Sequence, residues 1–118
     1  MDALNITEMK EEWSRLMAIL SAQFDEAPDL QAIIFLVGVQ ELGQGSRKFS
    51  KDEKQDLMHI ATCKLMSYYG YYRLTGQDQE GWPQWELVKK LPALTLKEQD
   101  LILRQSVIQY FREQEIIT

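Results

Sequence analysis

The chain has 118 residues, of which 45% are hydrophobic, 10% aromatic and 26% charged, and its formal net charge is −5. This length and composition are typical of one folded domain and exclude a disordered chain. The single cysteine, Cys63, excludes a disulfide framework, and the longest apolar run, residues 32–39, is too short to cross a membrane. The first residues also lack the pattern of a signal peptide. We therefore predict a single domain over residues 1–118, located in the cytoplasm.

The negative charge is concentrated at the start of the chain. Residues 1–30 contain seven acidic and two basic side chains, whereas the acids and bases of residues 31–118 balance. Nucleic acids and anionic membranes are bound through basic surfaces that neutralise phosphate groups. We therefore expect neither as a partner.

Two helices are predicted in the first third of the chain. Asn5 and Glu8 have the spacing of a capping box, and apolar residues then recur at helical intervals up to Phe24. A second helix is predicted over residues 28–42, ending before Gly43, and its apolar residues point in every direction. A strand over residues 32–39 is the competing interpretation, which we reject because no partner strand is apparent. Gly38 inside this helix indicates a close crossing with a neighbouring helix.

The remaining elements are also predicted to be helical. Ser50 and Glu53 form a second capping-box pattern, which begins a helix that extends to Tyr69 or as far as Leu74. A short helix is predicted over residues 83–91, and Thr95 with Glu98 begins the last one. The predicted fold is all-α, an irregular bundle of about five helices around a buried second helix.

Few residues have the spacing that chemistry at a site requires. His59 and Cys63 are four residues apart on one predicted helix, but two ligands are too few for zinc. The glycines of residues 43–45 lack the phosphate-binding motif of nucleotide-binding loops. Asp100 and Arg104 fall within the apolar arc of the last helix, which predicts a partly buried ion pair. We expect no cofactor, metal or catalytic residue, and an enzyme is the less favoured class.

The most unusual feature is the aromatic segment, residues 68–85. It holds four of the five tyrosines and two of the three tryptophans, residue types that are enriched at protein interfaces. Packing over one end of the bundle is the alternative role for these rings. The candidate interaction surface consists of Tyr69, Tyr71, Tyr72, Arg73, Trp82 and Trp85.

The sequence is therefore compatible with two functions. The first is a protein-interaction module, either a homo-oligomer such as a homodimer or an adaptor for another protein, that uses the aromatic segment. The second is a small-ligand-binding bundle, with an enzymatic role left open, whose pocket lies between residues 28–42 and residues 68–85. Its candidate polar groups are Glu41, His59, Asp100 and Arg104.

Overall fold

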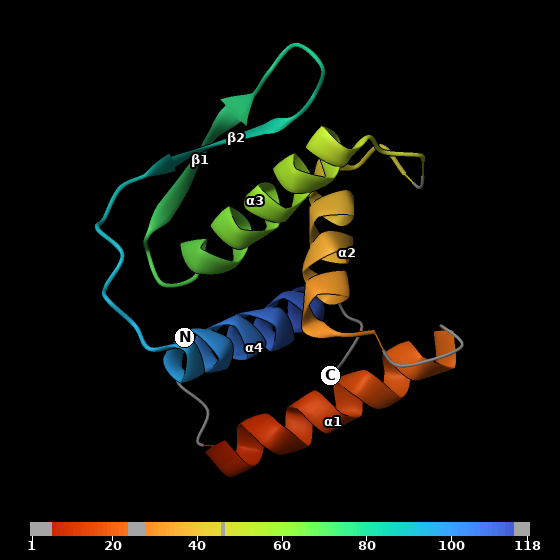
Figure 1. The fold of residues 1–118 in the computed structure, drawn as a ribbon, viewed down its shortest axis with the longest axis vertical. Helices are drawn as coiled ribbons and strands as arrows, with labels where there is room; N and C mark the ends of the chain where they lie inside the picture. The colour runs from red at the N-terminus through yellow and green to blue at the C-terminus, as the bar shows by residue number, and fades with distance from the viewer. Residues whose placement is uncertain (1–5, 24–27, 46, 115–118) are drawn as a thin grey trace. The chain divides into compact units, whose positions relative to one another are not determined.

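The computed structural model describes residues 6–23, 28–45 and 47–114, which form four helices and a two-stranded antiparallel sheet (Figure 1). In chain order the elements are α1 (Ile6–Gln23), α2 (Leu30–Leu42), α3 (Lys51–Ser67), β1 (Tyr72–Gln77), β2 (Pro83–Leu87) and α4 (Leu96–Glu113). None of the helices in the described ranges is both long and apolar enough to cross a membrane.

The prediction of an all-α bundle of about five helices is wrong. The segment predicted to be a short helix over residues 83–91 contains strand β2, and the extension of the third helix towards Leu74 is strand β1. Gly70, with φ of +81°, follows α3 in a conformation that disfavours further helix. Beyond it, apolar and polar residues alternate with the period of two that a strand requires. Each of the two strands then provides the other with its backbone hydrogen-bond partners.

The four long helices lie close to their predicted ranges. The capping boxes of Ser50 with Glu53 and of Thr95 with Glu98 are both formed, with side chain and backbone bonded reciprocally. Gly43 ends α2 with φ of +71°, and its N–H donates to the carbonyl oxygen of Val39 at 3.2 Å. Asn5 and Phe24, the predicted ends of the first helix, lie outside the described residues.

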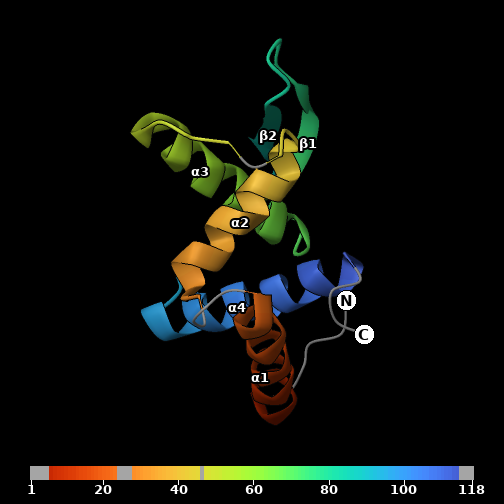
Figure 2. The same cartoon turned by 90° about the vertical axis from the view of Figure 1, so that its right-hand side faces the viewer.

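The chain divides into two compact units, residues 1–30 with 93–118 and residues 31–92, which are described separately. Its organisation as a single domain stays a prediction. In the first unit, α1 packs against α4 (Figure 2). Glu12 of α1 forms an ion pair with Arg112 of α4 at 3.1 Å, and the Arg104 guanidinium lies 4.6 Å from the ring centre of Trp13. The two helices are therefore joined by polar contacts beside their apolar residues.

The second unit is built on a close crossing of α2 and α3, which confirms the prediction made from Gly38 (Figure 2). A Cβ atom at Gly38 would overlap the Leu57 carbonyl group, since it would lie 2.9 Å from the carbonyl carbon. Only glycine allows the two backbones to approach so closely. The hairpin then lies alongside α3 (Figure 1).

Helix α2 is buried along one side only, so the prediction of burial all round is wrong. Ile33 and Val37 are fully inaccessible and Ile34 is nearly so. Leu36 is only partly buried, and Gln40 is exposed. A prediction based on apolar residues on every side of the helix thus overestimates its burial, because some of these residues stay partly accessible to solvent.

Candidate functional site

The hairpin and the segment after it, residues 71–91, form a surface with two different faces and are called the hairpin region below. Tyr72 lies opposite Leu87, and Leu74 lies opposite Trp85. Because successive side chains of a strand alternate between faces, these two cross-strand pairs share one face. Arg73 lies opposite Glu86 on the other face, and the two form an ion pair at 2.9 Å.

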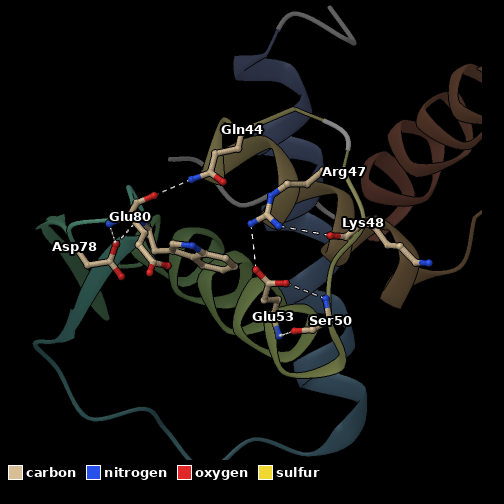
Figure 3. Close-up of polar contacts among 8 residues, drawn as sticks. Gln44, Arg47, Lys48, Ser50, Glu53, Asp78 and Glu80 are labelled. Atoms are coloured by element: carbon tan, nitrogen blue, oxygen red, sulfur yellow. Dashed lines mark hydrogen bonds and ion pairs between the residues drawn. The ribbon is translucent and has the colours of Figure 1, made fainter.

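A network of hydrogen bonds fixes the turn between the strands. The carboxylate Oδ1 of Asp78 accepts the backbone N–H groups of Glu80 and Trp82, both at 2.9 Å. The side chain of Gln44, from the segment after α2, donates to the Glu80 carbonyl oxygen at 2.8 Å (Figure 3). The turn is therefore held both by its own aspartate and by a distant segment of the chain.

Trp82 connects this turn to the core of the second unit. It is partly buried and packs against the buried cluster of Leu42, Phe49 and Leu57. Phe35 of α2 meets Phe49 edge to face, with ring centres 6.1 Å apart. Trp82 is thus positioned by apolar contacts from three segments that are distant in sequence.

The start of α3 is stabilised by polar contacts next to this cluster (Figure 3). Glu53 accepts a hydrogen bond from the Ser50 backbone N–H at 2.9 Å and pairs with Arg47 at 3.1 Å. These contacts, with the Ser50 hydrogen bond as the largest cause, lower the pKa of Glu53. The guanidinium of Arg47 is therefore engaged with the carboxylate of Glu53 at the start of α3.

The predicted aromatic surface is less accessible than a binding surface would suggest. Tyr69, Tyr71, Tyr72, Trp82 and Trp85 are all partly buried, whereas Arg73 is exposed. Burial raises the pKa of the Tyr69 phenol.

Lys89 contacts two of these tyrosines, the backbone of one and the ring of the other. Its ammonium group donates to the Tyr69 carbonyl oxygen at 3.1 Å and lies 4.4 Å from the ring centre of Tyr71. Through these contacts the tyrosines hold the segment after β2 in place, so they have a structural role in the hairpin region.

The exposed apolar side chains of the hairpin region are aliphatic, and sequence reasoning missed them. Six large hydrophobic side chains are exposed among the described residues, and four of them belong to this region. Their exposed fractions are 52% for Leu74, 51% for Leu87, 48% for Val88 and 42% for Leu91. The strand alternation of residues 72–77 was the signal that could have identified the first of them.

A cavity of about 280 Å³ lies between α3 and the hairpin. Its apolar walls come from Ile60, Trp82, Pro83 and Trp85, and its polar walls come from Asp56, His59, Asp78 and Gln84. The indole Nε1 of Trp85 is covered and has no hydrogen-bond partner among the described residues. The cavity therefore combines two indole rings with two carboxylates.

The four candidate polar groups predicted for a ligand pocket are distributed over both units. His59 lines the cavity described above, but Glu41 of α2 is not among the residues that line it. Asp100 and Arg104 belong to the other unit and form the predicted hydrogen-bonded ion pair at 2.7 Å, with side-chain exposures of 46% and 30%. Their binding role stays a prediction.

The thiol of Cys63 has an environment that suppresses its reactivity. It is inaccessible and lies 3.5 Å from the His59 Nε2 atom, and burial raises its pKa to about 11. At pH 8 about one thiol in a thousand is then ionised. We expect Ellman's reagent to react slowly with the native protein and rapidly after denaturation. Rapid reaction of the folded protein, followed at 412 nm on this single cysteine, would contradict the burial.

Among the described ranges, no group of three or more histidine, cysteine or carboxylate side chains is arranged to hold a metal ion. The chain matches no protein-family model, and it shows no significant similarity to a curated protein or to a solved structure. A functional argument therefore depends on the hairpin region and the cavity themselves.

Proposed function

We propose that this protein is a protein-interaction module that binds a second copy of itself through the hairpin region. The observation that carries the proposal is the concentration of exposed apolar side chains in this region, where Leu74 and Leu87 project from the same face of the hairpin. Apolar surface gains about 25 cal/mol for each Å² that is removed from water, and clusters of such side chains on monomers often mark interfaces. The exposed aliphatic side chains thus supply the driving force for association.

The backbone of the hairpin supports the same proposal. The Val88 N–H donates to the Tyr71 carbonyl oxygen, so hydrogen-bonded and non-bonded pairs alternate from that point. Tyr72, Leu74, Trp85 and Leu87 are then in non-bonded pairs, and their N–H and C=O groups point away from the partner strand. Such edges accept a further strand. A second hairpin could satisfy them together with the apolar side chains.

The charge of the hairpin region favours a second copy as the occupant. The whole chain carries −5, so two copies repel each other on average. Residues 71–91, in contrast, contain three acidic and three basic side chains and are neutral. Two copies can therefore approach through this region without the repulsion that the rest of the chain imposes. A cytoplasmic location is part of the proposal and is supported by the single buried thiol, which is preserved in a reducing compartment.

The proposal is tested by replacing two exposed leucines. Leu74→Thr with Leu87→Thr removes apolar surface while keeping residues that suit a strand. We expect the native chain to sediment as a dimer at micromolar concentrations. The dimer dissociation constant of the double variant should be at least about tenfold higher, because a tenfold change requires the loss of only about 1.4 kcal/mol of binding free energy.

Leu96→Thr is the matched control, since Leu96 is 83% exposed and lies at the start of α4, outside the hairpin region. It should leave the sedimentation unchanged. A native chain that stays monomeric across the concentration range would contradict self-association and would favour a different protein as the partner.

A further inference from the structure

The cavity between α3 and the hairpin is lined by aromatic and charged side chains, unlike a packing defect, which is lined by apolar side chains. Two indole side chains, Trp82 and Trp85, line it beside two carboxylates, Asp56 and Asp78. Asp56 and His59 are three residues apart on α3 and so project from the same side of this helix. The other walls come from the turn and β2, so the cavity exists only because the hairpin lies against α3.

The two carboxylates in this cavity have no ion-pair partner among the described residues. No lysine or arginine is among the residues that line it. Asp78 uses Oδ1 for two backbone N–H groups, and its Oδ2 atom has no partner within the described part of the chain. Asp56 likewise has no ion-pair or hydrogen-bond partner there. The negative charge is therefore available to a ligand.

We propose that this cavity binds an organic cation, a quaternary ammonium, alkylammonium or guanidinium group. The faces of indole rings attract cations, and tryptophan is the strongest of the aromatic residues in this respect. Nearby carboxylates add a Coulombic attraction that bare aromatic walls lack. The volume of about 280 Å³ lies just below the usual range of ligand pockets, about 300 to 1,000 Å³, and suits a compact cation.

Hydrogen bonds in the turn between β1 and β2 keep this wall of the cavity in one conformation. The bonds that Asp78 accepts from Glu80 and Trp82 fix the carboxylate and the indole in one loop. The side chain of Gln84 donates to the Trp82 carbonyl oxygen at 3.2 Å, next to the same wall. A preformed site of this kind loses little conformational entropy when a ligand binds.

The site uses cavity side chains and not the exposed aliphatic side chains, and it shares with the proposed self-association surface only Trp85, whose backbone belongs to the strand edge. The same cationic chemistry occurs in free small molecules and in lysine or arginine side chains of a polypeptide. Choline represents the first source, and the blocked amino acids N-acetyl-lysine methylamide and N-acetyl-arginine methylamide represent the second. Binding of either class supports the proposal, and their relative affinities identify the source.

The experiment follows the indole N–H resonances of the full chain by NMR during titration. We expect saturable shifts for Trp82 and Trp85, whereas Trp13 on α1 serves as an internal reference. The neutral isostere of choline, 3,3-dimethyl-1-butanol, should bind at least about tenfold more weakly, because it keeps the shape and loses the charge.

Two carboxylate variants locate the attraction. Asp56→Asn combined with Asp78→Asn should weaken binding of the best cation at least about tenfold, because both charges are removed. The asparagine oxygen at position 78 can still accept the turn N–H groups, so the fold is retained. Asp52→Asn is the matched control on the same helix, outside the cavity, and should change affinity less than about twofold.

Three results would overturn the proposal. These are the absence of saturable shifts with every cationic probe, equal binding of choline and its neutral isostere, and equal binding by the double variant and the native chain. Sedimentation of the same samples separates this outcome from a failure of self-association, since the cavity variants leave Leu74 and Leu87 in place.

Discussion

Replacing Leu57 with alanine is expected to lower the free energy of unfolding by about 2–5 kcal/mol. Leu57 is fully inaccessible and lies in the cluster with Leu42 and Phe49, on which Trp82 packs. The loss combines the transfer free energy of the removed atoms with the cavity that they leave. Because Trp82 packs against this cluster, the same variant should alter the fluorescence of its indole before global unfolding.

Chemical denaturation followed by circular dichroism measures this effect. Leu57→Met is the matched control, since it nearly conserves volume and should cost less than about 1.5 kcal/mol. A loss for Leu57→Ala that does not exceed the loss for Leu57→Met would show that the side chain is not enclosed as described.

Replacing Gly38 with alanine is expected to destabilise the protein by about 1–3 kcal/mol. The sign is the informative part, because glycine to alanine in an open helix position is stabilising by about 1 kcal/mol. At Gly38 the added methyl group would overlap the backbone carbonyl of Leu57, which cannot move away without separating α2 from α3. The expected result is thus opposite to helix propensity.

The control for this variant is Ala32→Gly at an exposed position of α2, where propensity alone should cost up to about 1 kcal/mol. Both variants are compared by denaturant midpoint. Stabilisation of the protein by Gly38→Ala would mean that α2 and α3 do not cross at this glycine.

Sequence alone predicted features that depend on residues close together in the chain. The capping boxes at Ser50 and Thr95 and the hydrogen bond from Arg104 to Asp100 each join residues three or four positions apart. Helical geometry brings such residues together wherever the helix is placed. The close crossing at Gly38 is an exception, because a glycine inside an apolar helix indicated a close neighbour from another element without identifying Leu57 as that neighbour.

The hairpin and both proposed sites depend on residues that are distant in the chain. A strand gains its backbone hydrogen bonds only from a partner strand. The alternation of residues 72–77 therefore could not predict a strand without the pairing that places Leu87 opposite Tyr72. Asp56 and Asp78 line one cavity although the end of α3 and strand β1 separate them in the chain. The sequence determined the four long helices and the capped starts of α3 and α4, because these form from local contacts. Only the tertiary structure decided that the aromatic segment forms a hairpin, that its aliphatic side chains stay exposed, and that its tryptophans line a cavity against α3, because each depends on non-local packing.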